Sequence, residues 1–382
     1  MNSNIKALGI RNCFGCAVCA KACPEQIIKT RINESGFFEP FIISSSNCIG
    51  CGICVDVCSY LNGGIALDAG LLDAYAGWSN DDEVRRRCSS GGVGFELART
   101  ALTDGYKACA VRYNISKNIA EHFIAANIDE LQFSIGSKYI QSDTLAGMEH
   151  ININERYILF GTPCHIDSYR RYLRRFKKEN NFILVDFFCH GVPSYLLWNK
   201  YLETKRSETG EIEHISWRDK KYGWHDSWAM NIRGKRGGVN ARLSDGDLFF
   251  KTFLSDSCLS KACYDDCKFK FRKSSADVRL GDAWGQLYQN NYEGVSAVIC
   301  LTTKGRELLK SSNCTIVSHD FNRIAEYQMR SNAKRPVIYA AVQQLLKKDG
   351  PLDINKLKLL LRTHEILQLP KRIKKKLVKI IK

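Results

Sequence analysis

The sequence predicts an α+β or α/β protein with a small cysteine-rich βαβ module, a larger mixed-sheet α/β domain and a helical basic tail. Two observations lead to this prediction. Eight of the 17 cysteines fall between Cys13 and Cys58, in two runs of identical spacing. Farther along the chain, a strand followed by a cysteine-bearing loop and a helix occurs twice, which is typical of βαβ units.

We expect four segments: the module at 1–65, two parts of the larger domain at 72–150 and 151–325, and the tail at 326–382. A chain of 382 residues is long enough for two or three domains. Its content of 45% hydrophobic and 25% charged residues is that of an ordinary globular protein. No apolar run is long enough to predict a transmembrane helix.

The formal net charge of +16 is unevenly distributed. Through residue 70, five basic residues balance five acidic ones, so the module is neutral and the positive charge lies downstream. Residues 371–382, KRIKKKLVKIIK, contain seven basic residues and no acidic one. No zinc finger or RNA-recognition motif accompanies this charge, so we expect no nucleic-acid partner.

Each cysteine run has the spacing Cys-x2-Cys-x2-Cys-x3-Cys. In proteins with this spacing, three thiolates bind one [4Fe–4S] cluster and the fourth binds the other. The predicted ligands are therefore Cys13, Cys16, Cys19 and Cys58 for one cluster and Cys48, Cys51, Cys54 and Cys23 for the second. Zinc ribbons use paired cysteines instead of triplets closed by a fourth.

A disulfide framework is disfavoured because the first residues, MNSNIKALGI, lack the apolar region of a signal peptide. We therefore expect a reducing, cytoplasmic location. Over residues 1–60 the chain resembles the two-cluster bacterial ferredoxins. Between the two runs, IIKTRINESGFFEPFII predicts a hairpin.

The larger domain is expected to begin near Leu72, with a strand at AYAGWSN. The segment Arg85–Gly92 then leads into a helix at VGFELARTAL. KACAVRY and EHFIAAN predict paired strands, and IDELQFSIGSKYIQSD predicts a helix followed by a polar turn.

The two strand–loop–helix units come next. RYILF ends at Gly161-Thr162-Pro163-Cys164, and FILVDFF ends at Cys189-His190-Gly191, each before a helix. Functional groups in such sheets gather at the carboxyl ends of the strands, where Cys164 and Cys189 fall. Residues 212–250 predict meandering strands, and a final strand–helix pair closes the domain near residue 320.

Five downstream cysteines are candidate ligands: Cys164, Cys189, Cys258, Cys263 and Cys267. Four thiolates from separate loops would suit a third cubane cluster. The alternative is a set of buried structural thiols. We assign Cys88, Cys109, Cys300 and Cys314 to that structural class.

Six ordered motifs carry a second resemblance: SSGG at 89–92, GSKYIQS at 136–142, GTPC at 161–164, CHGVPS at 189–194, the pair Cys263/Cys267 and DVRLGDAWG at 277–285. Residues 72–320 are similar to the beta-subunit family of coenzyme F(420) hydrogenases and dehydrogenases. Members typically bind FAD and an iron–sulfur cluster, and they pass electrons between the flavin and a substrate or deazaflavin coenzyme.

The resemblance implies a third cluster on Cys164, Cys189, Cys263 and Cys267. The spacing Cys263-x3-Cys267 is wider than the expected Cys-x2-Cys, so Cys258 is a possible substitute ligand. The resemblance also implies FAD near Ser90, Gly91, Gly92, Lys138, Tyr139, Gln141, Ser142, Gly161, Thr162, Pro163, Gly281 and Trp284, with Asp282 bordering the same cavity.

Physical reasoning leaves alternatives for three of these features. The glycines before the VGFELARTAL helix could hold a pyrophosphate or simply start a capped helix. Asp282 could reach a ribose hydroxyl or a flavin edge, or cap the next helix. His190 could transfer a proton in catalysis, or donate a hydrogen bond to cluster sulfur.

We therefore predict an oxidoreductase in which electrons pass from a donor such as reduced ferredoxin, through the clusters and FAD, to an organic substrate or a deazaflavin-type coenzyme. The alternative is a non-catalytic electron-transfer subunit of a larger redox complex.

In the tail, Ile373, Leu377, Ile380 and Ile381 share one helical face. This pattern predicts either a solvated terminus or a helix lying on the inner membrane surface. In the second case the substrate would be lipid-linked, for example an envelope polysaccharide intermediate.

Overall fold

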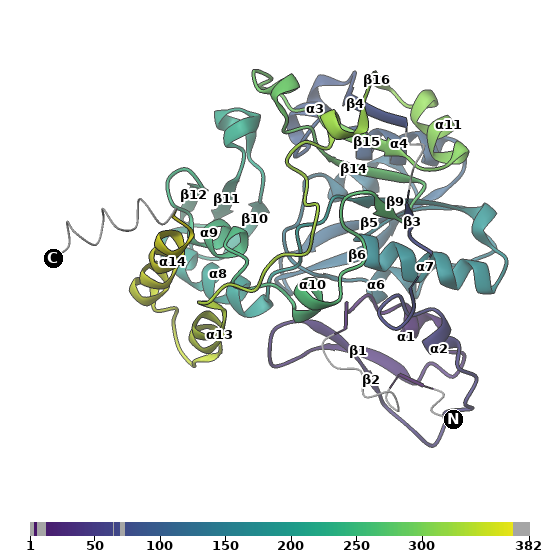
Figure 1. Ribbon diagram of the computed structural model, residues 1–382, viewed down its shortest axis with the longest axis horizontal. Coiled ribbons are helices and arrows are strands. Elements are labelled where there is room, and N and C mark those ends of the chain that lie inside the picture. The colour runs from purple at the N-terminus through teal and green to yellow at the C-terminus, as the bar shows by residue number, and fades with distance from the viewer. Residues whose placement is uncertain (1–3, 6–12, 64, 69–72, 370–382) are drawn as a thin grey trace.

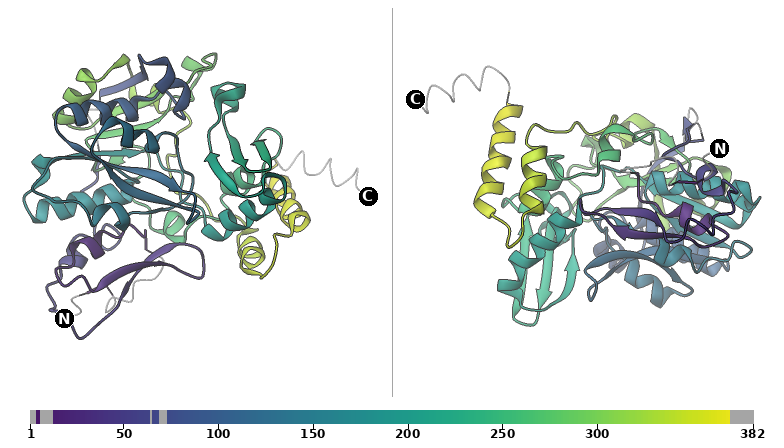
Figure 2. Two further views of the ribbon diagram at one scale, coloured as in Figure 1. Left: turned by 180° about the vertical axis from the view of Figure 1, so that it is seen from behind. Right: turned by 90° about the horizontal axis from the view of Figure 1, so that it is seen from below.

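A nine-stranded mixed sheet is the largest element of the molecule, and two smaller parts lie beside it (Figure 1). One is the cysteine-rich module, and the other is a lobe of three strands with helices around them. Figure 2 shows the same arrangement from behind and from below. The structure is a computed structural model that describes residues 4–5, 13–63, 65–68 and 73–369.

The large sheet has the strand order β16-β4-β15-β14-β9-β8-β5-β6-β7. The four neighbours β14, β9, β8 and β5 run parallel, and antiparallel strands flank them. The strands are β4 (Asp73–Ser79), β5 (Lys107–Asn114), β6 (Ile119–Ala125), β7 (Ser142–Asp143), β8 (Tyr157–Phe160), β9 (Phe182–Phe187), β14 (Val278–Asp282), β15 (Ser296–Cys300) and β16 (Cys314–His319). The predicted mixed α/β fold is therefore confirmed.

Helices cover both faces of this sheet. Helices α4 (Val93–Thr103) and α11 (Thr303–Ser311) pack on one face, and α7 (Pro163–Arg175) packs on the other. Five consecutive residues of β9, Phe182 through Asp186, are buried. The first four are apolar, and a buried apolar run of this kind is typical of a parallel strand covered on both sides.

The segment boundary expected at residue 150 divides the strands of this sheet into two groups. Strand β5 lies beside β8, and β4 lies beside β15, so the 72–150 and 151–325 segments share one set of strands. Leu72, the expected start of the domain, lies outside the described residues, and β4 begins at Asp73.

The cysteine-rich module contains α1 (Val18–Ala22), α2 (Ile53–Asp56) and the hairpin of β1 (Ile28–Ile32) and β2 (Phe38–Ile42). The two strands pair antiparallel, as predicted. Val18 and Val57 are fully buried, and they belong to the same apolar core as Ile166 of α7. The module is therefore packed onto the α7 side of the large sheet.

The second lobe contains β10 (Ile212–Ser216), β11 (Ala229–Gly234) and β12 (Gly237–Arg242) in an antiparallel sheet. Its helices are α8 (Tyr195–Thr209), α9 (Leu248–Leu254), α13 (Tyr339–Lys347) and α14 (Ile354–Gln368). The predicted meander is confirmed except at its end. The residues at 248–250 begin α9, because Asp247 caps that helix by accepting from Phe250 N.

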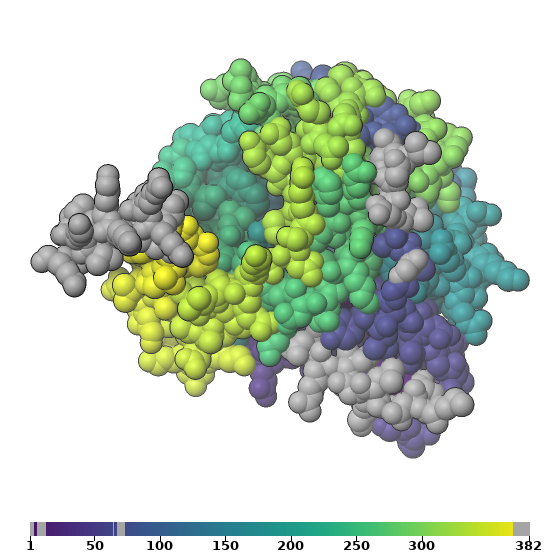
Figure 3. Space-filling view, in the orientation of Figure 1, coloured from purple at the N-terminus to yellow at the C-terminus, as the bar shows by residue number. Residues whose placement is uncertain are grey.

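The helices expected in the tail are part of this lobe's core. Val342, Leu346 and Leu357 are buried in the same cluster as Trp198 of α8. Residues 325–338 reach them from α12 (Phe321–Ile324) by crossing the front surface without a helix or strand (Figures 1 and 3). The amphipathic pattern of Ile373, Leu377, Ile380 and Ile381 lies outside the described residues.

Short elements complete the described chain: α3 (Asp82–Arg87), α5 (Ile128–Leu131), η1 (Gln132–Ser134), α6 (Leu145–Met148), η2 (Glu179–Asn181), η3 (Lys220–Tyr222), η4 (Trp224–Asp226), α10 (Lys261–Asp265), η5 (Gln286–Tyr288), and β3 (Leu67–Asp68) paired with β13 (Lys273–Ser274). Within the described ranges, no helix has the length and apolar character needed to cross a membrane.

Candidate iron–sulfur and cofactor site

The outer set is the group Cys23, Cys48, Cys51 and Cys54. All four line one cavity in the module, together with apolar side chains such as Ile27, Ile28 and Ile42. Burial raises the pKa of Cys54, and the neighbouring Cys51, Cys23 and Cys48 raise it further. Cys51 is exposed, so this set lies at the surface. The structure thus brings together the four cysteines that the spacing assigns to one cluster.

The inner set is the group Cys13, Cys16, Cys19 and Cys58. Burial raises the pKa of Cys13 to about 12 and that of Cys16 to about 11. Cys58 lies close enough to the other three to raise their pKa values electrostatically. The fourth cysteine of each run therefore joins the other run's triplet, as the sequence predicted.

Gly15 makes the inner set's turn possible. Its φ of +66° lies in the left-handed region that favours glycine. A Cβ at this position would lie 2.3 Å from Phe38 O and 2.3 Å from Gln141 Nε2. The backbone between Cys13 and Cys16 can therefore approach the hairpin and the large domain only because this residue has no side chain.

The third set is the group Cys164, Cys189, Cys263 and Cys267. Cys164 lies in the first turn of α7, Cys189 follows β9, and Cys263 lies in α10. Burial raises the pKa of Cys164, and Cys189 and Cys263 raise it further. The pKa of Cys263 is raised to about 12 by burial and then by Cys189 and Cys267. Three separate parts of the chain thus place four thiols together.

Cys258 lies apart from the third set. It is fully buried in the apolar core of the lobe, and its Sγ donates a hydrogen bond to Thr252 O at 3.6 Å. The wider spacing of Cys263 and Cys267 is accommodated because Cys263 is helical and Cys267 follows the end of that helix. We therefore retain Cys263 and Cys267, not Cys258, as the candidate ligands.

The chemistry of these donor sets fits iron–sulfur clusters. Several buried thiols cannot ionise together without a compensating cation, which an iron core supplies. Among the described residues, no three His, Cys, Asp or Glu side chains converge closely enough to hold a single metal ion. Thiolates around a cubane each ligate a separate iron, so they surround a volume instead of converging on a point.

The three sets form a continuous series. Cys54 of the outer set raises the pKa of Cys19 in the inner set. Cys16 of the inner set raises the pKa of Cys164 in the third set. The order is therefore outer, inner, third, running from an exposed face of the module into the large domain.

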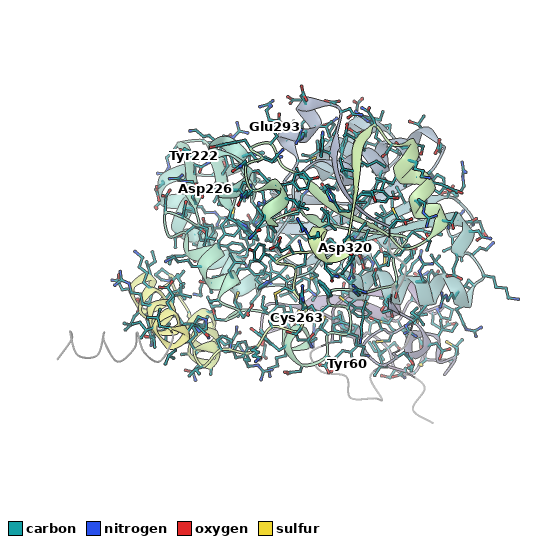
Figure 4. The ribbon with its side chains drawn as sticks, turned by 45° about the horizontal axis from the view of Figure 1, so that its top comes forward. Tyr60, Tyr222, Asp226, Cys263, Glu293 and Asp320 are labelled. Atoms are coloured by element: carbon teal, nitrogen blue, oxygen red, sulfur yellow. The ribbon has the colours of Figure 1, made fainter. Side chains whose placement is uncertain are left out.

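Hydrogen bonds hold the module against the large domain. Ser59 Oγ donates to Cys164 O at 2.9 Å, and Thr144 Oγ1 donates to Cys16 O at 2.8 Å. The pKa of Tyr60 is raised by burial and then by Asp266, which lies in the loop between Cys263 and Cys267 (Tyr60 and Cys263 are labelled in Figure 4). These contacts join the inner set directly to the loops of the third set.

Gln141, predicted to lie near a flavin, is at this junction. Its Nε2 donates to Phe14 O at 3.2 Å, and its Oε1 accepts from Phe38 N at 2.7 Å. Ser142 Oγ is hydrogen-bonded to His122 Nδ1 at 2.8 Å. The side chain of Gln141 therefore holds the module in place.

The glycines before α4 form a helix start. Gly92, with a φ of +88°, is the N-cap residue, and Gly91 N donates to Ser296 Oγ at 3.1 Å. Ser90 Oγ donates to Val295 O at 2.8 Å. The capped-helix interpretation thus describes the local geometry.

Two partly buried lysines lie beside this helix start. Lys138 Nζ donates to three main-chain carbonyls, and Lys220 Nζ donates to Arg85 O and Ser90 O. Burial lowers the pKa of Lys138 to about 7 and that of Lys220 to about 8. Within the described part of the chain, neither ammonium group has a carboxylate at ion-pair distance, and main-chain carbonyls hold both.

Arg218 is the central residue that sequence reasoning missed. Its guanidinium lies between the rings of Trp228 and Trp284, with centroids at 4.9 and 5.0 Å. Its Nη1 donates to Tyr139 OH at 2.9 Å and to Asp282 Oδ2 at 3.1 Å. The density of Trp residues around Arg218 in the sequence was the available signal, but no spacing connects position 218 to position 282.

Asp282 is therefore held in an ion pair and does not cap a helix. Trp224 Nε1 also donates to its Oδ1 at 3.2 Å, and Trp224 stacks on Trp284. Gly281 packs against Phe188, where a Cβ would lie 2.7 Å from the ring. The predicted residues Tyr139, Asp282 and Trp284 thus form one cluster around Arg218.

His190 is paired with an acidic side chain. Its Nε2 lies 2.7 Å from Asp256 Oδ1. Close by, Thr162 Oγ1 is hydrogen-bonded to Cys164 Sγ at 3.2 Å, and Pro163 occupies the first turn of α7. Gly161 lies against His165, where a Cβ would lie 2.3 Å from Nδ1. These residues line the carboxyl ends of β8 and β9.

Two family descriptions match this chain. Residues 154–318 match the C terminus of the coenzyme F420 hydrogenase/dehydrogenase beta subunit, and residues 12–62 match the 4Fe-4S dicluster domain. No curated protein matches the chain. A chain of the xenon-derivatised F420-reducing [NiFe] hydrogenase complex from Methanosarcina barkeri is similar in structure, with 14% identity, a TM-score of 0.46, and coverage of 76% of this chain and 90% of that chain.

The chain is thus an iron–sulfur redox protein. Its first part is similar to a 4Fe-4S dicluster domain, and its central part is similar to the C terminus of the coenzyme F420 hydrogenase/dehydrogenase beta subunit. Both resemblances drawn from the sequence motifs are confirmed.

Proposed function

We propose that the protein is an iron–sulfur flavoprotein that passes electrons through three cysteine-bound clusters and FAD to an organic substrate or a deazaflavin-type coenzyme. The observation that carries this proposal is the series of outer, inner and third sets, which is continuous from an exposed cysteine to the interior. A simple carrier needs no third set inside a large α/β domain.

The proposed ligands are the four cysteines of each set. [4Fe–4S] clusters bound there would supply one-electron transfer. FAD would accept electrons one at a time and transfer them to the substrate in pairs. The chain's own contribution is to hold the sets in order and exclude water between them. The buried junction of Ser59, Thr144 and Gln141 supports a module fixed to its own enzyme.

The proposed FAD position lies between the helix start at Ser90, Gly91 and Gly92 and the cluster around Arg218. The ammonium groups of Lys138 and Lys220 support it, since a diphosphate would compensate both charges. Tyr139, Gly281, Asp282 and Trp284 would border the ring, with Gly161, Thr162 and Pro163 on the side of the third set. His190 is the proposed proton donor, because its pairing with Asp256 fixes the ring.

The proposed donor is reduced ferredoxin, which would deliver electrons at the outer set, where Cys51 is exposed. The proposed location is the cytoplasm. A second candidate function is that of an electron-transfer subunit in a larger redox complex, and the match to a beta-subunit family favours it.

An anaerobic cofactor inventory tests the proposal. We expect about twelve irons per chain, since three cubanes contain four irons each, together with FAD. Turnover of the isolated chain with an artificial donor would favour the enzyme over the subunit. Finding about eight irons and no flavin would contradict the proposal and leave a two-cluster relay.

A further inference from the structure

A short segment, Lys268–Phe269–Lys270, lies between the inner and third sets. Lys270 Nζ donates to Cys189 O at 2.7 Å and to His190 O at 2.9 Å. Phe269 is buried, and its ring contacts that of Phe14, next to Cys13, with centroids 6.1 Å apart.

Lys268 makes the matching contacts on the other side. Its Nζ donates to the carbonyl oxygens of Ser59, Tyr60 and Asn62 at 2.8 to 2.9 Å, directly after Cys58. One segment therefore attaches a loop of each set and places one ammonium group beside each.

The charge of Lys270 acts on the third set. Lys270 Nζ is held by the main-chain oxygens of Cys189 and His190, which fixes the ammonium group beside Cys189. No carboxylate of the described residues lies at ion-pair distance from Lys270. Arg279 also acts on Cys189, but Asp186 holds it through two hydrogen bonds of 2.7 Å. Lys270 is therefore a positive charge with no counterion among the described residues, beside the partly buried cysteines of the third set.

We propose that Lys270 raises the reduction potential at the third set and so makes that site a better acceptor of electrons from the inner set. This inference rests on the proposed function, because it requires a cluster at the third set. In the step that Lys270 favours, one electron leaves the inner site, which is oxidised, and enters the third site, which is reduced. No proton or leaving group is exchanged.

The physical reason is the sign of the charge. Reduction makes a thiolate-bound cluster more negative, and a fixed positive charge in a low-dielectric interior stabilises the more negative form. Net charge and hydrogen bonding around the sulfurs are known determinants of cluster potentials. The main-chain carbonyls of Cys189 and His190 fix the ammonium group, so its effect does not depend on a flexible side chain.

Lys268 provides a matched control in the same segment. Its Nζ is held by main-chain carbonyls that closely follow Cys58, and it has no ion pair among the described residues. Removing its charge should therefore affect the inner site and leave the third site nearly unchanged.

The test is an anaerobic redox titration followed by EPR on the full chain, for the wild type, K270Q, K270R and K268Q. We expect K270Q to weaken reduction of the third site about tenfold, which is about 59 mV for one electron. K270R should leave the reduction potential of the third site near the wild-type value. K268Q should lower the reduction potential of the inner site instead. Iron content and thermal unfolding verify that each variant is loaded and folded.

An unchanged third-site potential in fully loaded K270Q would overturn the inference. A wild-type third site with a lower potential than the inner site would overturn it as well, even if K270Q failed to retain its iron. A wild type with only two clusters would instead contradict the proposed function, so the two failures are distinguishable.

Discussion

The dicluster module and the third set reach the same donor chemistry by different routes. The module's eight cysteines span residues 13–58, and two short helices and one hairpin position them. The third set draws on α7, the loop after β9, and α10, which together span about a hundred residues of sequence. The module's spacing is therefore readable locally, whereas the third set exists only when the whole sheet is folded.

This difference predicts how the two regions respond to damage. Removing a ligand from the module disturbs a small unit, but the third set links the sheet to both smaller parts. The measurements below test whether the two regions really differ in this way.

The largest expected effect is loss of a cluster. Cys164→Ser should remove about four of about twelve irons and leave the module's two clusters visible by EPR. Cys54→Ser should remove a similar amount from the outer site instead. Cys258→Ser is the control and should retain all iron, because Cys258 lies in the apolar core. Iron loss in Cys258→Ser with full loading in Cys164→Ser would reverse our choice of ligands.

A large loss of stability is expected at Arg218. Arg218→Met would leave the Asp282 carboxylate and the Tyr139 hydroxyl without their partner, which should cost about 3 kcal/mol of unfolding free energy. Urea denaturation of the loaded protein measures this. Arg236, which is exposed, is the control, and Arg236→Met should change stability by less than about 0.5 kcal/mol. Equal losses in the two variants would argue against a buried network.

A smaller effect is expected at the junction. Gln141→Ala would leave Phe38 N and Phe14 O unsatisfied, at a cost of about 2 kcal/mol. We expect a protease to release the module faster, and gel electrophoresis of samples taken over time measures the rate. The exposed Gln289→Ala should be cut at the wild-type rate. Unchanged cleavage of both variants would mean that other contacts suffice to hold the module.

The smallest expected effect is a dependence of anion binding on pH. Burial holds the pKa of Lys138 at about 7 and that of Lys220 at about 8, so both ammonium groups lose protons as the pH rises through this window. The affinity for inorganic pyrophosphate, measured by calorimetry, should therefore fall from pH 6 to pH 9. K220Q should reduce the change in affinity at the high-pH end of this range. Arg85, Arg218, Asp282 and Cys88 also face Lys220, and burial raises the pKa of Cys88 to about 11, above this range.

The same two lysines should affect stability in the opposite direction. Their folded pKa values are below the ordinary 10.5, so the unfolded chain binds more protons between about pH 7 and 10.5. Their contribution to stability without an anion should therefore rise with pH across that window. A pyrophosphate affinity that rises together with stability would exclude these lysines as its binding groups.

Much of the fold was predictable because its signals are local. The β1–β2 hairpin, the α4 helix, the β5–β6 pair and the two strand–loop–helix units follow from apolar periodicity and turn residues. The start of α9 was missed because Asp247 caps a helix whose first residues are aromatic and resemble a strand. The packing of α13 and α14 into the lobe was missed because an amphipathic pattern shows that a helix face is buried but not which element it packs against.

The pairing within the dicluster module could be read from the chain before any fold was known, since cysteine spacing constrains which thiols can surround a cluster. Folding was needed to show that Cys258 lies apart from the third set, that Arg218 joins Asp282, and that Gln141 contacts the module. These contacts join residues far apart in the chain, so they depend on how strands and loops pack. The same is true of Lys268 and Lys270, whose charges acquire a role only because the fold places a cysteine set beside each.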